Sequence, residues 1–248
     1  MIDVTDLAAD MTDLAIPSPN VWNWPDVYEV ENRAQDADGA IWLALRDLCP
    51  WDGADVVDIG CGDGFHLPMF AATAASVTGV EPHPGLLRRA RQRIAGLPAV
   101  SVHAGHAQRT GLPAASADLV HARTAYFFGP GCEPGLREAN RLLRPGGTLA
   151  IVDLDATRSP YGSWMRADLP CYDPDAVQHF FDRNGFDTTR VDTVWRFANR
   201  ADLENVLRIE FSATVSRRAI AATTGLTIPV AYRLHTRRKP AGLLRATT

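Results

Sequence analysis

The sequence predicts an α/β fold, namely a doubly wound, Rossmann-like seven-stranded sheet, mostly parallel with one antiparallel strand near the edge, plus a helical cover. Three observations lead to this prediction. Short β-branched runs alternate with helical segments over residues 52–155. The first run ends in Asp58-Ile59 and passes directly into G-C-G-D-G at residues 60–64. The second run ends in Glu81. A strand, a glycine turn and a helix form half of a βαβ unit, whose loop lies where parallel sheets bind ligands.

The glycine spacing separates two classes of cofactor. A dinucleotide fold requires G-x-G-x-x-G, so that the pyrophosphate can approach a helix N-terminus. Here the pattern is G-x-G-x-G, and Phe65 stands where the third dinucleotide glycine would fall. Glu81 stands at about the distance expected for an acid that accepts hydrogen bonds from ribose hydroxyls. No Tyr-x-x-x-Lys pair is recognisable, so a nicotinamide-dependent oxidoreductase is the disfavoured alternative.

The other elements of the sheet follow from local patterns. Apolar positions at helical spacing alternate with β-branched runs, and Asp173-Pro174 and Gly185 mark the start and the end of one helix. Helices are expected at residues 67–75, 84–94, 134–143 and 173–184. Strands are expected at residues 56–59, 76–81, 100–104, 118–122, 148–154, 186–197 and 226–236.

Two helical segments lie outside this alternation. Residues 26–48 have Ile41, Leu45 and Leu48 at helical spacing, and Pro50 ends the helix. Residues 200–223 form a helical insertion between the last two strands, suited to an acceptor lid or to a contact within a homo-oligomer. Residues 1–19 are expected to be a mobile tail, because Pro17-Ser18-Pro19 breaks any helix.

Four segments together resemble class I S-adenosylmethionine-dependent methyltransferases, of the type that acts on small molecules. They are residues 56–64, residues 77–90, residues 104–120 and residues 138–152, in the order found in that family. The resemblance implies a single methyltransferase domain over residues 20–240, with a helical cover at 20–48 and a cofactor-binding core at 52–155. It also implies S-adenosyl-L-methionine as the cofactor and a small molecule as the methyl acceptor.

The resemblance assigns cofactor contacts to residues that match the family motifs. They are Asp58, Gly60, Gly62, Gly64, Glu81, His106 and Ala107. The family usually carries an acid at the position of His106, near the adenine amino group. A neutral imidazole also accepts a hydrogen bond, and the backbone of this turn can hold the ring edge. Because of this departure, a non-catalytic protein that binds S-adenosylmethionine stays open as a further alternative.

The acceptor and the catalytic residues are not identified by any motif. The segment after the fourth strand lacks the Asn or Asp, two prolines and an aromatic that methyltransferases of nucleobases and protein amides carry. Acceptor contacts are expected from Tyr126, Arg158, Tyr161 and Trp164, and further pocket contacts from Tyr28, Glu31 and Asn32. If the nucleophile is a hydroxyl or an ammonium group, His121, Asp155 or His235 are candidates to accept its proton.

Composition limits the partners and the compartment. The formal net charge of -4 gives no electrostatic reason to expect nucleic acid as a partner. The four cysteines show no C-x-x-C pairing and no metal-ligand spacing, so free thiols in a reducing cytoplasm are expected. Residues 1–16 lack the positive start of a secretory signal, and no apolar run approaches the length needed to span a membrane.

Overall fold

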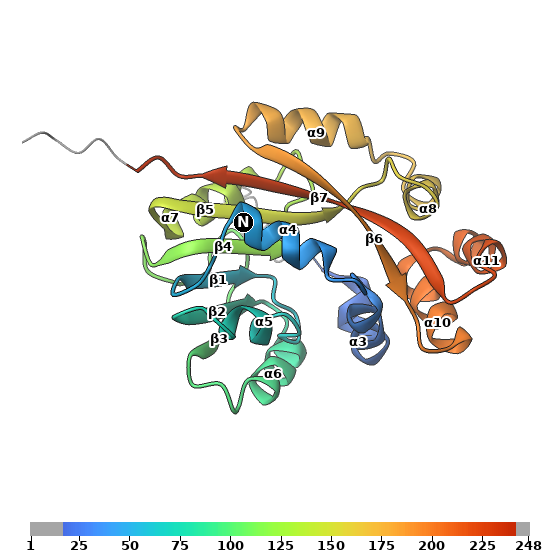
Figure 1. Ribbon diagram of the computed structural model, residues 1–248, viewed down its shortest axis with the longest axis horizontal. Coiled ribbons are helices and arrows are strands. Elements are labelled where there is room, and N and C mark those ends of the chain that lie inside the picture. Colours follow the sequence, from blue (N-terminus) through green and yellow to red (C-terminus); the bar gives the residue numbers. More distant parts are fainter. Residues whose placement is uncertain (1–16, 242–248) are drawn as a thin grey trace, which may run out of the picture.

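The computed structural model describes residues 17–241. Residues 1–16, which hold most of the expected mobile tail, and residues 242–248 lie outside the described part. Figure 1 shows one twisted sheet with the strand order β3-β2-β1-β4-β5-β7-β6. The strands are β1 (Asp55–Ile59), β2 (Ser76–Glu81), β3 (Val100–Ala104), β4 (Ala117–Arg123), β5 (Leu143–Leu154), β6 (Asp187–Arg196) and β7 (Thr227–Arg238).

The sheet is parallel from β3 to β5, and β7 runs antiparallel to both of its neighbours, β5 and β6. This arrangement confirms the predicted fold class. The one irregularity in the parallel part lies between β4 and β5, where Ala117 pairs with Leu143 but Leu119 pairs with Thr148. β5 therefore begins earlier than expected and carries a bulge at residues 144–147, with Gly146 at a φ of 85°.

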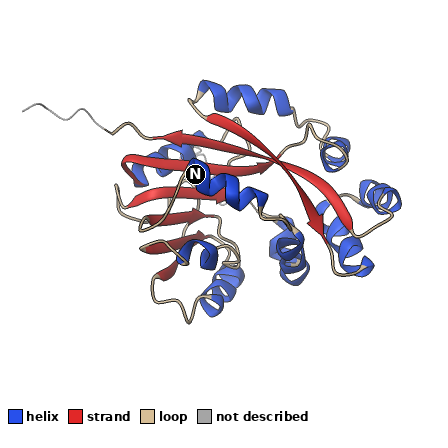
Figure 2. Ribbon diagram, viewed as in Figure 1, coloured by secondary structure: helices blue, strands red, loops and turns tan. Residues whose placement is uncertain are grey.

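Helices cover both faces of the sheet (Figure 2). Along β1 and β4, successive side chains enter opposite apolar clusters: Val56 and Leu119 belong to one cluster, whereas Val57 and Val120 belong to the other. The helices α4 (Ala40–Leu48) and α5 (Leu67–Ala71) contribute to the first cluster, and α7 (Glu133–Leu142) and α9 (Pro174–Arg183) contribute to the second. Because both faces are covered, the central strands are apolar on both sides.

The segment 26–48 forms two helices, so the prediction of one continuous helix was wrong. α3 (Pro25–Ala34) and α4 are separated by Asp36, at a φ of 49°, and Gly39, at a φ of 72°. The carboxylate of Asp36 accepts hydrogen bonds from the backbone N–H of Ile41 at 3.0 Å and of Trp42 at 3.4 Å. These bonds satisfy N–H groups at the start of α4, which makes the break favourable.

Within residues 17–241, the remaining helices are those of the insertion between β6 and β7 and three that lie elsewhere in the chain. The insertion between β6 and β7 consists of α10 (Arg200–Glu210) and α11 (Ala213–Ala222), and α10 packs against α3 (Figure 1). The helix α2 (Pro19–Asn23) lies at the start of the expected helical cover 20–48, α8 (Tyr161–Asp168) was not expected, and α6 (Pro84–Arg93) lies where predicted. In the part of the chain that the structure describes, no helix is both long and apolar enough to cross a membrane.

Candidate functional site

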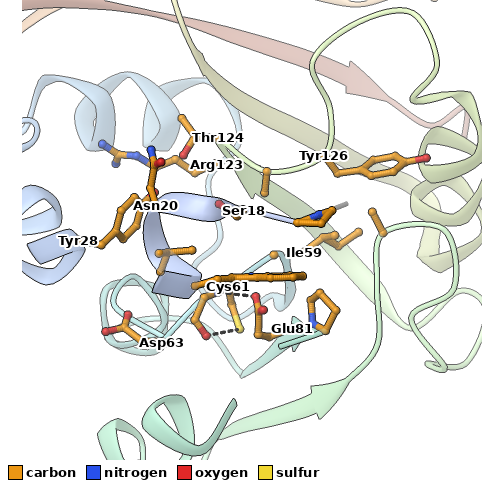
Figure 3. A pocket seen from close by; sticks show the side chains of 18 of the residues that line it. Ser18, Asn20, Tyr28, Ile59, Cys61, Asp63, Glu81, Arg123, Thr124 and Tyr126 are labelled. Atoms are coloured by element: carbon orange, nitrogen blue, oxygen red, sulfur yellow. Dashed lines mark hydrogen bonds between the residues drawn. The ribbon is translucent and has the colours of Figure 1, made fainter. Parts of the chain in front are cut away.

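A cavity of about 480 Å³ opens at the carboxyl ends of the four parallel strands β1 to β4 (Figure 3). This is the place where open parallel sheets bind their ligands. The glycine loop after β1 forms one wall, and α2, α3 and the end of β4 form another. The residues that line the cavity include Asn20, Trp22, Tyr28, Asn32, Gln35, Ile59, Gly60, Cys61, Gly62, Asp63, Phe65, His66, Glu81, Pro82, His106, Ala107, Arg123, Thr124, Ala125 and Tyr126.

The glycines of the loop have three different tasks. All three have positive φ values, of 74° at Gly60, 58° at Gly62 and 80° at Gly64. A Cβ at Gly60 would lie 2.5 Å from the Cβ of Ala125, so the loop approaches the end of β4 closely. A Cβ at Gly62 would meet no atom within 4 Å. Gly62 thus keeps the cavity open beside the backbone.

Gly64, by contrast, does not line the cavity. A Cβ there would contact Ala90 and Leu67 at 3.2 Å, so this glycine lets the loop pack on the neighbouring helices. This position favours a packing role for Gly64 over the direct cofactor contact that was expected.

Glu81 lies between the loop and the cavity. Its carboxylate accepts the backbone N–H of Gly62 at 3.1 Å and that of His83 at 2.8 Å. Burial raises the pKa of Glu81, while these two hydrogen bonds act in the opposite direction. Since each carboxylate oxygen has two lone pairs, both oxygens keep the capacity to accept a hydrogen bond from a ligand.

Asp58 and His121 form a buried pair behind the loop. The Oδ1 atom of Asp58 lies 2.7 Å from Nδ1 of His121, and neither residue lines the cavity. The ring of His121 packs edge-on against Phe70, with ring centroids 5.0 Å apart. Asp58 and His121 therefore form a buried pair away from the cavity lining, a position that does not favour the cofactor contact expected of Asp58 or the proton-acceptor role expected of His121.

Arg93 holds the glycine loop against the cover helix. Its guanidinium pairs with the Asp63 carboxylate at 2.8 Å, donates from Nε to the Asp63 carbonyl oxygen at 3.1 Å, and also pairs with Glu29 of α3. Sequence reasoning missed this residue because it stands in a run of arginines on α6 that is typical of a solvent-exposed face. The partners of Arg93 are distant in sequence, so no local signal identifies them.

The turn after β3 and the short helix α2, which we call the lid helix, border the side of the cavity where the resemblance places the adenine. His106 and Ala107 both line the cavity, as do Ile59 and Pro82 on the adjacent strand ends. The backbones of His106 and Arg109 form a small bridge at 3.0 and 3.2 Å that fixes this turn. Trp22 of α2 stacks on His83 at a centroid distance of 4.8 Å. The lid thereby rests on the end of β2.

The end of β4 has an unusual backbone. Thr124 and Tyr126 are non-glycine residues with φ values of 45° and 58°, and both line the cavity. A positive φ is a clear outlier for a β-branched residue such as threonine, and such outliers cluster at functional sites. Figure 3 shows Thr124 beside Arg123 and Asn20, with Tyr126 on the opposite side of the cavity. Tyr126 thus lies where an acceptor contact was expected.

The remaining expected acceptor residues lie away from the cavity. Arg158 is exposed on a loop, Tyr161 donates from its hydroxyl to Glu210 at 2.5 Å, and Trp164 packs edge-on against Phe211. None of the three lines the cavity, because the segment after β5 turns into α8 and packs on the insertion. Their positions therefore do not favour the acceptor contacts that were expected.

Two expected proton acceptors are also structural. Asp155 is buried and accepts hydrogen bonds from Thr157, with an ion pair to Arg190 at 3.2 Å. His235 stacks on Phe181 at a centroid distance of 4.0 Å, and burial lowers its pKa to about 3. Neither residue lines the cavity. Their positions therefore do not favour the proton-acceptor roles that were expected.

The cover helix presents a polar stripe to the cavity. Tyr28, Asn32 and Gln35 line the cavity at helical spacing on α3 and its C-cap, so the expectation for Tyr28 and Asn32 agrees with their position. The third expected residue, Glu31, is buried behind them, where its Oε1 accepts a hydrogen bond from Gln35 at 2.7 Å.

Glu31 forms a carboxyl pair with Glu210 of the insertion. Burial raises the pKa of both carboxyls above their usual range. The charge of Glu210 raises the pKa of Glu31 further. Glu210 also accepts hydrogen bonds from Asn20 of the lid helix at 2.5 Å and from Tyr161 at 2.5 Å. The insertion is therefore joined to α2, α3 and α8 at one buried point.

Comparison with known proteins agrees with this geometry. Residues 57–151 match the family model described as a methyltransferase domain. Over these residues the chain is similar to methyltransferase domains. In that domain β1, the glycine loop, β2, β3, β4 and β5 fall inside the matched residues or at their edges. No group of three or more His, Cys, Asp or Glu side chains able to hold a metal ion occurs within residues 17–241.

Curated relatives match the same part of the chain. An uncharacterised methyltransferase of Mycobacterium tuberculosis is 34% identical over 122 residues, which cover 49% of this chain and 61% of that protein. The chain thus spans about three fifths of the length of this relative. A trans-aconitate 2-methyltransferase of an Azoarcus species is 39% identical over 114 residues, covering 44% of each chain.

Solved structures share the fold at low sequence identity. The YcgJ protein of Bacillus subtilis superposes with a TM-score of 0.60 at 18% identity, over 83% of this chain and 100% of that chain. A [4+2]-cyclase, SpnF, gives a TM-score of 0.59 at 16% identity, over 93% of this chain and 100% of that chain. At such identities the likeness concerns the fold alone.

Proposed function

We propose that the protein transfers a methyl group from S-adenosylmethionine to a small-molecule acceptor. The observation that carries this proposal is the single cavity in which Gly62 and Glu81 form one wall and the end of β4 forms another. A donor and an acceptor held in such a cavity lie close to each other and away from bulk water. Proximity and exclusion of water are the main contributions that a methyl transfer requires from a protein.

The residues at the glycine-loop wall suit the donor. Gly62 lacks the side chain that would fill the space beside its backbone, and Glu81 retains acceptor capacity for ribose hydroxyls. His106 and Ala107 offer backbone and side-chain groups to the adenine edge, with Ile59 and Pro82 as apolar walls. When bound, S-adenosylmethionine supplies a methyl group on a sulfonium, which is already a good leaving group.

Two further residues of the cavity are better suited to orienting the acceptor than to removing its proton. Tyr28 and His66 line the cavity, and burial raises the pKa of the Tyr28 hydroxyl and lowers that of the His66 imidazole. Both groups are therefore neutral at physiological pH. They can donate or accept a hydrogen bond to position a nucleophile.

Isothermal titration of the purified protein tests the proposal. S-adenosylmethionine and S-adenosylhomocysteine are expected to bind with micromolar dissociation constants, whereas NAD and NADP are expected not to bind. Binding of the nicotinamides alone would favour the oxidoreductase alternative. Absence of binding by all four would reject the donor site.

A second experiment separates catalysis from binding alone. The [4+2]-cyclase among the structural neighbours has the same fold, so the fold does not by itself imply methyl transfer. Transfer of labelled methyl from S-adenosylmethionine to a panel of small molecules is the deciding readout, and trans-aconitate, the acceptor named for the Azoarcus relative, is a suitable first member. Tight donor binding with no transfer to any member would favour the non-catalytic alternative.

A further inference from the structure

One buried cation faces the cavity. Arg123 is the last residue of β4, its side chain is only 8% exposed, and it lines the cavity. Among the described residues that line this cavity, it is the only lysine or arginine. Figure 3 shows its side chain beside Asn20, on the side of the cavity opposite Cys61 and Glu81. A burial of this degree is unusual for an arginine that is not paired with a carboxylate.

Arg123 has only neutral partners among the described residues. Its Nη2 donates to the Gln35 amide oxygen at 2.9 Å, and its guanidinium lies 5.3 Å from the centre of the Tyr232 ring. Its Nε is buried with no hydrogen-bond partner, and no carboxylate of residues 17–241 lies within ion-pair distance. In contrast, Arg93 and Arg141 each pair with a carboxylate at 2.8 Å or closer.

The nearby acid Glu31 does not supply the missing charge. Gln35 stands between the two groups, because its amide nitrogen donates to Glu31 while its amide oxygen accepts from Arg123. Burial and the neighbouring Glu210 raise the pKa of Glu31, which favours the neutral carboxyl form, although the hydrogen bond from Gln35 and the charge of Arg123 act in the opposite direction. A buried charge without an ionic partner is costly, so the cation at this position calls for an anionic group from outside the protein.

We propose that Arg123 binds a carboxylate group of the methyl acceptor. This assignment rests on the proposed function and names the substrate class of the same site. The planar guanidinium fork matches a carboxylate with two parallel hydrogen bonds, which a lysine would not offer. Arg123 packs against Tyr232 of β7 and Gln35 of α3, across the cavity from the loop and Glu81. This position favours the carboxylate of the acceptor over the carboxylate of the donor.

The first experiment separates the two sources of a carboxylate. S-adenosylhomocysteine and 5′-methylthioadenosine, which lacks the amino-acid part of the donor, are titrated into the wild type, Arg123→Gln and the exposed control Arg196→Gln. Both ligands are expected to bind all three proteins with similar affinity. A tenfold loss for S-adenosylhomocysteine in Arg123→Gln, with unchanged binding of methylthioadenosine, would assign Arg123 to the donor and overturn the proposal.

The second experiment tests the acceptor directly. Benzoate, succinate and citrate, together with benzamide and succinamide, are titrated into the protein saturated with S-adenosylhomocysteine. At least one carboxylate is expected to bind the wild type and Arg196→Gln, its amide is expected not to bind, and Arg123→Gln is expected to lose at least tenfold in affinity. Equal binding by Arg123→Gln, or no carboxylate binding by the wild type, overturns the proposal.

A second variant and the binding of the donor product separate a failure of the Arg123 assignment from a failure of the proposed function. If Arg123→Gln does not fold, Arg123→Lys is used in its place. Lysine keeps the positive charge but lacks the planar guanidinium that donates two parallel hydrogen bonds. An unchanged carboxylate affinity in Arg123→Lys overturns the proposal. If the wild type fails to bind S-adenosylhomocysteine, the proposed function itself is rejected. Normal donor binding with no binding of carboxylates rejects only the assignment of Arg123.

Discussion

Position 60 requires glycine because the loop after β1 lies close to the segment that follows β4. A Cβ at this position would lie 2.5 Å from the Cβ of Ala125, and the φ of 74° disfavours any L side chain. We expect Gly60→Ala to displace the loop or the end of β4 and to abolish measurable binding of S-adenosylhomocysteine in a titration. Gly96→Ala is the matched control, since a Cβ there meets nothing within 4 Å. Wild-type affinity in Gly60→Ala would mean that the loop adapts.

Glu81 is expected to contribute to donor binding in two ways. Its carboxylate fixes the N–H of Gly62 and keeps lone pairs for the ribose. Replacement by alanine removes both, so Glu81→Ala should weaken the binding of S-adenosylhomocysteine by about 1–3 kcal/mol, or roughly 5- to 150-fold. Titration of Glu81→Ala and of the exposed control Glu133→Ala measures this. An equal loss in both variants would point to a general loss of stability.

Residues of the site were predictable from the sequence where their signal is local. Gly60, Gly62 and Glu81 stand in one strand, turn and strand unit, and their roles follow from backbone geometry. Arg123 carries no such signal, because its partner Gln35 lies 88 residues away and its burial depends on the packing of α3. The pairing of His121 with Asp58 has no local signal for the same reason, since the two residues lie 63 positions apart.

At the scale of elements, the sequence predicted every strand and most helices, because apolar periodicity is strong in a sheet covered on both faces. It failed where a break depends on the backbone. Asp36 and Gly39 adopt positive φ values and end the expected helix 26–48 in its middle. The D-A-D-G stretch at residues 36–39 was the available signal, because Asp and Gly favour such turns.

The junction between α10 and α3 makes stability depend on pH. Glu31 and Glu210 have pKa values raised above the ordinary 4.5 by burial. The folded state therefore holds protons that the unfolded state releases, and the free energy of unfolding falls as pH rises above about 4.5 toward the raised pKa values. Glu210→Gln removes one of the two carboxyls. We expect this variant to gain stability relative to the wild type as pH rises over this range.

Urea denaturation between pH 5 and 8 measures this difference. Glu204→Gln is the matched control on the same helix, since two arginines lower the pKa of Glu204 and its contribution is lost as pH falls. Its difference from the wild type should thus stay constant between pH 5 and 8, because Glu204 is ionised in both the folded and the unfolded state over that range. A constant difference between Glu210→Gln and the wild type would show that the carboxyl pair titrates normally.

At the scale of the whole molecule, segments that are distant in sequence meet around one cavity. The lid helix α2, the cover helix α3 and the end of β4 contribute side chains to it together with the glycine loop. A ligand bound there contacts many elements of the native state and none of the unfolded chain. Binding is thus linked to the stability of the entire domain.

The linkage predicts a thermal shift that is specific for the donor class. S-adenosylhomocysteine at 100 times its dissociation constant should add about 2.7 kcal/mol to the free energy of unfolding, which corresponds to a rise in Tm of roughly 5–10 °C for a chain of this size. Differential scanning calorimetry with NAD as the control ligand measures the shift. At the same ligand concentration, Glu81→Ala should show a much smaller rise, because its dissociation constant is larger. Equal shifts in the two proteins would place the ligand away from Glu81, and a shift with NAD alone would assign the cavity to a dinucleotide.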